Sequence, residues 1–188
     1  MVAAAKIIGS REIQAAITRL AAAISARHPV RQGVLLLGIA NGGVELACRL
    51  ARITGAQAGA VDISFHRDDI ARRPIPKERA PTHIPADVSG ATVILIDDVL
   101  FSGRTVKAAL DELFDHGRPN KVELAVLVDR GCRRLPFAAD YAGLAIASDE
   151  SEKVEVVLDP SSPLRDRIRV RPAAAPAAPR FRPPARPS

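Results

Sequence analysis

Three apolar runs limit the folds open to this chain. They lie at residues 34–40 (VLLLGIA), 92–96 (TVILI) and 122–128 (VELAVLV). Runs of this kind are typical of strands buried on both faces of a parallel sheet, because a strand with one face in water alternates apolar and polar residues. Helical patterns follow the first two runs, over residues 44–53 and from Thr105. The alternation predicts an α/β fold with a mostly parallel central sheet flanked by helices.

A first helix is predicted where apolar residues recur every three or four positions, which places them on one helical face. These residues are Ile13, Ile17, Leu20 and Ile24. We expect Ser10 to be its N-cap and the helix to end before His28. Alternating apolar residues predict a strand over residues 60–65, and residues 154–158 are expected to form an edge strand.

The length and charge distribution indicate one folded domain with a tail. The chain has 188 residues, 47% of them hydrophobic, which suits a single domain over residues 1–170. Residues 171–188 hold six of the 15 prolines and no acidic residue, and they carry +4 of the formal charge of +6. Such a composition predicts a disordered tail. An inert extension is favoured over a weak phosphate or RNA tether.

A second unusual segment lies inside the domain. Residues 66–90 contain four prolines and many charged residues, among them Arg67. Polar loops of this length in compact domains are often lids or binding arms. A flexible lid loop is therefore predicted here.

Two kinds of protein are not expected from the sequence. No stretch approaches the roughly 18 apolar residues of a membrane span, and the N-terminus has no signal-peptide pattern, so we expect a cytoplasmic protein without a membrane partner. Cys48 and Cys132 share no spacing with each other or with histidines that would indicate a zinc site or a disulfide framework. Both are expected to be reduced thiols.

The segment at residues 93–106 (VILIDDVLFSGRTV) carries the clearest chemical signal. A turn over Ser102–Thr105 would present amides and hydroxyls at a helix N-terminus, where an anion is favoured. Asp97 and Asp98 precede it at the carboxyl end of a strand, where they could accept hydrogen bonds from a sugar diol or help to hold Mg²⁺. The acidic pair alone could be a plain metal site, and the turn alone could be an ordinary loop with a helix cap. The combination describes a site for a phosphorylated ribose.

This segment resembles the phosphoribosyl-pyrophosphate signature of the type I phosphoribosyltransferases. Further blocks, DISFHRDD at residues 62–69 and LAVLVDRG at residues 124–131, follow in the order and spacing of the PyrR family. The resemblance spans about residues 7–158. It implies the type I phosphoribosyltransferase fold and a homo-oligomer, expected to be a dimer.

The resemblance also implies roles for individual residues. Asp97 and Asp98 would contact the ribose hydroxyls, with Asp97 helping to hold the Mg²⁺ cofactor, and Arg67 in the lid would join them as a catalytic residue. The remaining implied substrate-binding residues are Ala40, Asn41 and Gly42 for pyrophosphate, Val99, Leu100, Phe101, Ser102, Gly103, Arg104 and Thr105 around the phosphate, and Asp129 and Arg130 for the base.

The chain departs from the family at two of these places. Many PyrR proteins have Thr-Arg where this chain has Asn41-Gly42, so backbone amides, Mg²⁺ and Arg67 are expected to share the pyrophosphate charge. Cys132-Arg133-Arg134 stands where the family commonly has His-Arg-Glu.

The expected activity is transfer of a phosphoribosyl group from 5-phosphoribosyl 1-diphosphate to uracil, giving UMP and diphosphate.

The alternative is an RNA-binding regulator of pyrimidine genes that senses UMP or UTP. An aromatic content of 3%, with one tyrosine, offers few stacking surfaces for RNA. RNA binding would be favoured by four basic residues near the N-terminus, Arg11, Arg19, Arg27 and Arg31. Their helical spacing also suits a solvated helix face. A purine or orotate phosphoribosyltransferase is a third candidate.

Overall fold

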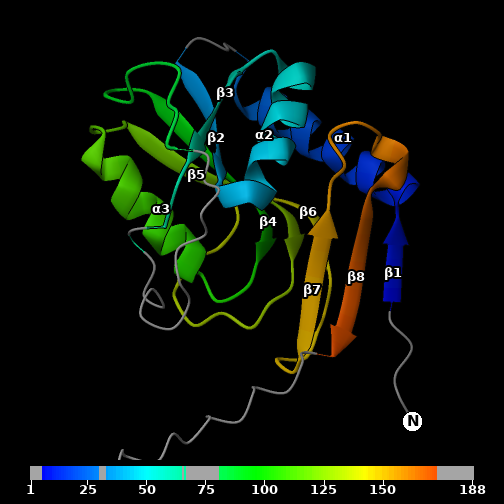
Figure 1. Cartoon of the computed structure of the whole chain (residues 1–188). Coiled ribbons are helices and arrows are strands. Elements are labelled where there is room, and N and C mark those ends of the chain that lie inside the picture. The colour runs from blue at the N-terminus through cyan, green and yellow to red at the C-terminus, as the bar shows by residue number, and fades with distance from the viewer. Residues whose placement is uncertain (1–5, 30–32, 65, 67–80, 173–188) are drawn as a thin grey trace, which may run out of the picture.

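A five-stranded parallel sheet forms the centre of the computed structural model, which describes residues 6–29, 33–64, 66 and 81–172 (Figure 1). The strand order is β3-β2-β4-β5-β6, and every neighbouring pair is parallel. The strands are β2 (Val34–Ile39), β3 (Gln57–Val61), β4 (Thr92–Leu100), β5 (Lys121–Asp129) and β6 (Tyr141–Ala145). The predicted α/β class with a parallel sheet is confirmed.

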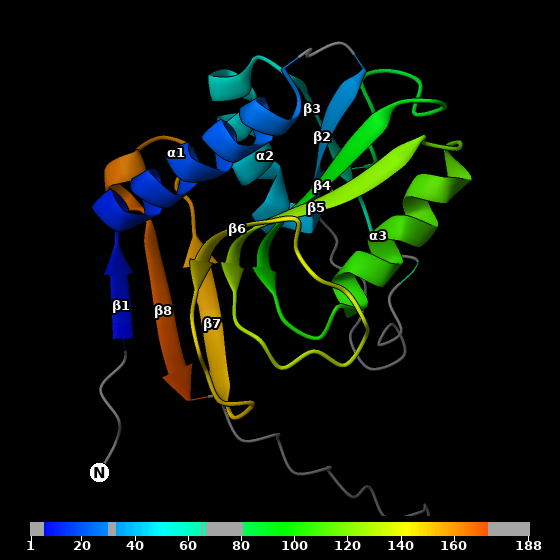
Figure 2. The same cartoon turned by 180° about the vertical axis from the view of Figure 1, so that it is seen from behind.

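Helices cover both faces of this sheet. The helices α1 (Ser10–Arg27) and α2 (Ala40–Thr54) lie on one side, and α3 (Arg104–Asp115) lies on the other (Figures 1 and 2). In β4, Ile94 and Ile96 pack into the core beneath α1 and α2, whereas Val93 and Leu95 pack into the core beneath α3. All four are essentially inaccessible to water. This arrangement explains why the strand sequence is apolar at successive positions.

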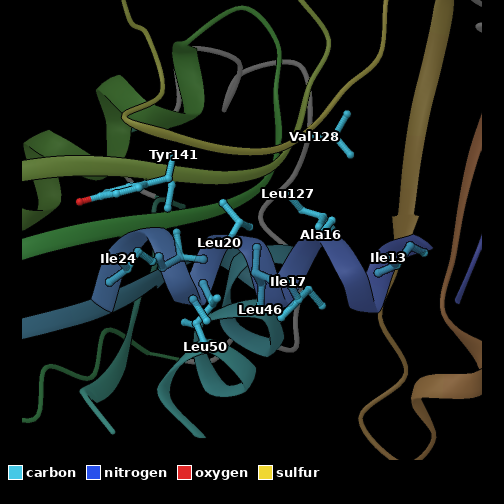
Figure 3. Packing of buried hydrophobic residues seen from close by; sticks show 14 of the residues in the cluster. Ile13, Ala16, Ile17, Leu20, Ile24, Leu46, Leu50, Leu127, Val128 and Tyr141 are labelled. Atoms are coloured by element: carbon cyan, nitrogen blue, oxygen red, sulfur yellow. The ribbon is translucent and has the colours of Figure 1, made fainter. Parts of the chain in front are cut away.

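The first helix packs as its spacing predicts. Figure 3 shows Ile17 and Leu20 directed toward the residues of α2 and the sheet that form the same cluster. Burial of each such side chain stabilises the fold by about 1.5–3 kcal/mol. The expected end before His28 is confirmed, but Ser10 is not the N-cap. Gly9 has that position, and the Ser10 hydroxyl instead donates a hydrogen bond to the Pro163 carbonyl at 2.7 Å.

A second, antiparallel sheet stands beside the first, with the order β1-β8-β7 (Figure 2). Its strands are β1 (Lys6–Gly9), β7 (Glu152–Val157) and β8 (Arg167–Pro172), and a short 3-10 helix, η1, spans Pro163–Arg165. The buried Arg49 of α2 joins it to the main body. Arg49 forms ion pairs with Asp166 and Glu45 and donates a hydrogen bond to the Asp159 carbonyl at 2.7 Å.

Several predicted boundaries were wrong. The helix predicted over residues 44–53 begins at Ala40, because the glycine turn is its first turn, and the strand predicted over residues 60–65 is β3, which ends at Val61. The strand predicted over residues 154–158 is β7 (Glu152–Val157), and its expected position at a sheet edge is confirmed.

Parts of the predicted lid and tail lie outside the described residues. These are residues 67–80, with Arg67, and residues 173–188. Arg171 and Pro172, which we assigned to the tail, form the end of β8 and pair with β7. Within the described part of the chain, no helix is long and apolar enough to cross a membrane.

Candidate active site

The site residues lie where the carboxyl ends of β2, β4 and β5 meet the loops that follow them. Open parallel sheets bind ligands at this edge because the strand-to-helix loops converge there. The strand β4 extends through the acidic pair to Leu100, four residues further than predicted. The first turn of α2, which follows β2 directly, lies against the Asp98 carboxylate, and the Arg130 amide donates to the Leu100 carbonyl at 3.2 Å. Three segments distant in sequence therefore share one edge.

Asp97 and Asp98 form an acidic pair in which Asp97 is buried and Asp98 is half-buried. The Asp97 side chain is buried, and its Oδ1 accepts a hydrogen bond from the Asp98 amide at 3.0 Å. Burial, followed by the nearby charge of Asp98, raises the pKa of Asp97 well above its ordinary value. Burial likewise raises the pKa of Asp98. Two carboxylates in this environment favour a ligand that brings hydroxyl donors or a cation.

The turn from Phe101 to Arg104 leads directly into α3. Gly103 has a φ of +87°, in the left-handed region that favours glycine, and a side chain there would collide with Phe137 and Leu135. The Ser102 hydroxyl accepts a long hydrogen bond of 3.4 Å from the Arg104 amide. The first amides of a helix lack acceptors within it, and the helix dipole favours an anion at this end. The turn therefore has the chemistry of a phosphate site.

The first turn of α2, residues 40–43, which we call the glycine loop, packs tightly against β4. A β-carbon on Gly42 would overlap the Asp98 carboxylate, and one on Gly43 would overlap the Ile96 carbonyl. Ala40 has a positive φ of 48°, a conformation that costs non-glycine residues about 1–2 kcal/mol. The loop is thus held with its main chain beside the acidic pair, and Gly42 leaves no room for the arginine that many PyrR proteins have unless the Asp98 side chain moves.

Arg133 links the loop after β5 to the turn after β4. Its guanidinium forms an ion pair with Asp129 at 2.6 Å. It also donates to four main-chain carbonyls, those of Leu100 (3.2 Å), Phe101 (3.1 Å), Gly131 (3.0 Å) and Phe137 (3.0 Å). Further contacts reinforce the link, since the amides of Arg134 and Leu135 both donate to the Ser102 carbonyl. We did not predict this role, because four of its five acceptors are main-chain carbonyls, which leave no mark in the sequence.

Arg130 supports the same loop from inside. It is buried, and its guanidinium carbon lies 4.1 Å from the centre of the Phe101 ring. It donates to the Asp149 carbonyl at 2.8 Å. Cys132 has a positive φ of 56° and its thiol faces the Ser148 carbonyl at 3.5 Å. Arg130 and Cys132 thus shape the loop through contacts within the protein.

Comparison with known proteins agrees with this geometry. Residues 6–159 match the phosphoribosyl transferase domain family. The chain is 43% identical over 159 residues to the bifunctional protein PyrR of a Geobacter species, covering 81% of this chain and 90% of that protein. It is 44% identical over 160 residues to the bifunctional protein PyrR of Chloroflexus aurantiacus, covering 81% and 87%. The chain belongs to the PyrR family.

Solved structures of other phosphoribosyltransferases share the fold. The hypoxanthine phosphoribosyltransferase of Trypanosoma cruzi superposes with a TM-score of 0.62 at 21% identity, covering 87% of this chain and 94% of that one. A hypoxanthine-guanine phosphoribosyltransferase from Bacillus anthracis gives 0.59 at 20% identity, covering 78% and 86%. The predicted type I phosphoribosyltransferase fold is confirmed. Phosphoribosyl transfer, with 5-phosphoribosyl 1-diphosphate and a nucleobase as substrates, follows from membership of the PyrR family.

The structure separates the predicted site residues into three groups. The first is at the shared edge and comprises Ala40, Asn41, Gly42, Asp97, Asp98, Phe101, Ser102, Gly103, Arg104, Thr105, Asp129 and Arg130. The second is Val99 and Leu100, whose side chains pack against opposite core clusters, with Leu100 fully buried. Only the main chain of Leu100 faces the loop after β5. The third is Arg67, which lies outside the described residues.

Proposed function

We propose that this PyrR-family chain is a uracil phosphoribosyltransferase that converts uracil and 5-phosphoribosyl 1-diphosphate into UMP and diphosphate. The observation that carries the proposal is the acidic pair at the end of β4, placed between the glycine loop and the start of α3. This sugar diphosphate requires carboxylates that accept hydrogen bonds from the ribose diol, amides that donate hydrogen bonds to the 5′-phosphate, and a main-chain loop that binds the pyrophosphate.

In this mechanism the anomeric carbon passes through a positively charged, oxocarbenium-like state. Asp97 and Asp98 hold the ribose hydroxyls and favour the positive charge that develops on the sugar. The amides of residues 103–105 hold the 5′-phosphate, so that the sugar is fixed at both ends. Main-chain amides of residues 40–43 receive the departing diphosphate. Arg67 would add a cation there.

Mg²⁺ fits the donor set of this site. The oxygen atoms of two adjacent carboxylates, together with ligand hydroxyls and phosphates, are the hard donors that Mg²⁺ prefers. Burial raises the pKa of both residues, and the charge of Asp98 raises that of Asp97 further, so a divalent cation nearby would relieve an unfavourable arrangement. When bound, the ion neutralises charge on the departing diphosphate, and Asp97 is the protein group proposed to hold it.

The loop after β5 is proposed to frame uracil. The Asp129 Oδ1 accepts the Gly131 amide at 3.0 Å, and its Oδ2 pairs with Arg133, so the main chain of residues 130–134 is held in place beside the phosphate turn. We propose that main-chain groups of this fixed loop contact the edge of the planar base. Arg130 supports this loop from beneath through its stacking on Phe101.

A second function, binding of RNA under the control of UMP or UTP, is favoured by a basic surface. On the second sheet, Lys153, Arg169 and Arg171 are exposed on neighbouring strands around a single acidic residue, Glu155, which pairs with Lys153 and Arg171. The relatives above are named as bifunctional. The arginines of α1 support it less. Arg19 donates to the Gly143 carbonyl and Arg27 pairs with Glu123, as expected for a helix face that serves the fold. We propose a homodimer for either function, to be measured by light scattering.

The activity is tested by incubating the full chain with Mg²⁺, 5-phosphoribosyl 1-diphosphate and, separately, uracil, orotate, hypoxanthine or adenine. Chromatography then measures the nucleotide formed. We expect UMP from uracil alone, with loss of activity in Asp98→Asn. The control Asp111→Asn changes an aspartate of α3 that pairs with Lys107, and it should behave as wild type. Product from another base would refute the uracil assignment, whereas UMP binding without turnover would favour the regulator.

A further inference from the structure

A second group of chemically active side chains lies near the C-terminal end of α3. It comprises His66, which follows β3, with Glu112 and Asp115 of α3. Glu112 lies eight residues beyond the start of α3 at Arg104, about 12 Å along the helix axis from the phosphate turn. The group therefore belongs to a different part of the surface from the acidic pair.

The distances within this group match those between the ligands of one metal ion. The His66 Nε2 lies 3.0 Å from the Glu112 Oε2 and 3.5 Å from the Asp115 Oδ2. The ligand atoms of all three residues lie within 4.8 Å of one another. Around a tetrahedral Zn²⁺ with bonds of about 2.0 Å, adjacent ligand atoms are about 3.3 Å apart. The three-residue spacing of Glu112 and Asp115 places both carboxylates on one helical face.

The donor types select the kind of cation. A histidine nitrogen with two carboxylate oxygens is typical of zinc and related transition metals, whereas Mg²⁺ and Ca²⁺ take oxygen ligands. A second imidazole is close, since the His116 Nε2 lies 3.2 Å from the other Glu112 oxygen. The Asp115 side chain is 71% exposed, so the open side of the group is accessible to water as a further ligand.

In the described part of the chain, the two carboxylates contact histidine and threonine side chains rather than lysine or arginine. Within the described residues these partners are two imidazoles and the Thr82 hydroxyl, which donates to the Glu112 Oε1 at 2.6 Å. A divalent cation would supply the positive charge that two adjacent carboxylates favour. We propose that His66, Glu112 and Asp115 bind one divalent transition-metal ion of the zinc class.

The position of this site links metal binding to the stability of the fold. Thr82 accepts the Asp62 amide at 3.0 Å while it donates to Glu112, so Glu112 joins the chain before residue 67 and the chain after residue 80. An ion bound by His66 and Glu112 would hold the end of the β3 segment against the helix that begins at the phosphate turn. Metal binding should therefore raise the melting temperature of the protein.

The test uses Zn²⁺ itself as the probe. The full chain is stripped with a chelator, exchanged into buffer with excess Mg²⁺ to occupy the acidic pair, and titrated with ZnCl₂ in a calorimeter. We expect one ion per chain and a rise in melting temperature. His66→Gln should weaken binding by at least about tenfold, because even the loss of a group that only supports a metal ligand costs that much. Co²⁺ should give the visible absorption of a tetrahedral site, and His66→Gln should abolish it.

His83→Gln is the matched control. His83 is exposed, and its main chain pairs with Ala60 outside the proposed ligand group. This variant should bind Zn²⁺ as wild type does, and circular dichroism establishes that both variants are folded. Absence of saturable Zn²⁺ binding by the wild type would overturn the proposal. Undiminished binding by His66→Gln, or loss of binding in Cys132→Ser instead, would overturn it as well.

Discussion

The carboxylate of Glu123 gives a quantitative prediction about stability. It is buried near the start of β5, at the opposite end of the strand from Asp129. Its Oε1 pairs with Lys121 at 2.6 Å and with Arg27 at 3.3 Å, while its Oε2 accepts from the Tyr141 hydroxyl at 2.7 Å and contacts the His28 Nε2 at 2.7 Å.

These contacts decide the sign of the pH dependence. Burial acts to raise the pKa of Glu123, but hydrogen bonds from Lys121, His28 and Tyr141 outweigh it and lower the pKa from 4.5 to about 2. A carboxyl with a pKa lowered in this way favours the folded state by about 3 kcal/mol once it is ionised. The stabilisation is fully present above pH 4.5 and is lost as the pH falls through 2.

Glu123→Gln removes the charge and keeps the size of the side chain. We expect the free energy of unfolding, measured by urea titration with circular dichroism, to fall by about 3 kcal/mol at pH 7 and by about 1.5 kcal/mol at pH 3. Other carboxyl groups titrate alike in both proteins, so they cancel in the difference. The control Glu155→Gln, on the edge strand β7, loses only ion pairs with the exposed Lys153 and Arg171, so it should change little at either pH. An equal loss for Glu123→Gln at both pH values would refute the electrostatic reasoning.

Three further variants test the active site. Asp98→Asn should weaken 5-phosphoribosyl 1-diphosphate binding at least about tenfold in calorimetry, yet raise the melting temperature, because it removes a charge beside the buried Asp97. Gly43→Ala should lower the free energy of unfolding by about 3 kcal/mol in urea titrations, because its methyl group overlaps the Ile96 carbonyl. Arg133→Lys keeps the charge but not the planar donor fork, so steady-state kinetics should show about a tenfold higher KM for the base with an unchanged KM for the sugar diphosphate.

The local parts of the fold could be predicted from the sequence, and the long-range parts could not. The strands β2, β4 and β5 can be recognised in the sequence because burial on both faces requires apolar residues throughout. The second sheet has no such mark. Its strands β1 and β8 pair residues as distant as Lys6 and Val170, and β1 has only Ile8 buried. A four-residue strand with one core residue cannot be distinguished from a loop by its periodicity.

The same contrast holds at the active site. Asp97, Asp98 and the Ser102–Thr105 turn were predicted because their chemistry is local, within one strand, one turn and one helix start. Arg133 was named only as part of a departure from the family, because its five interactions reach main-chain carbonyls and Asp129 on both loops. The group of His66 and Glu112 joins residues 46 positions apart, a separation at which sequence spacing carries no information about contact.

The glycine loop shows why a departure from the family pattern is compatible with the proposed function. The helix α2 begins at Ala40, immediately after β2, so no linker separates the strand from the helix and Gly42 is brought against the Asp98 carboxylate. An arginine at position 42 would have to displace that carboxylate or pair with it, which would compete with the ribose for Asp98. In the proposed mechanism, glycine at this position leaves the acidic pair available for the sugar, and the main chain and cations from elsewhere recognise the diphosphate. Catalysis by this chain should therefore depend more steeply on Mg²⁺ concentration than that of a PyrR protein with the arginine.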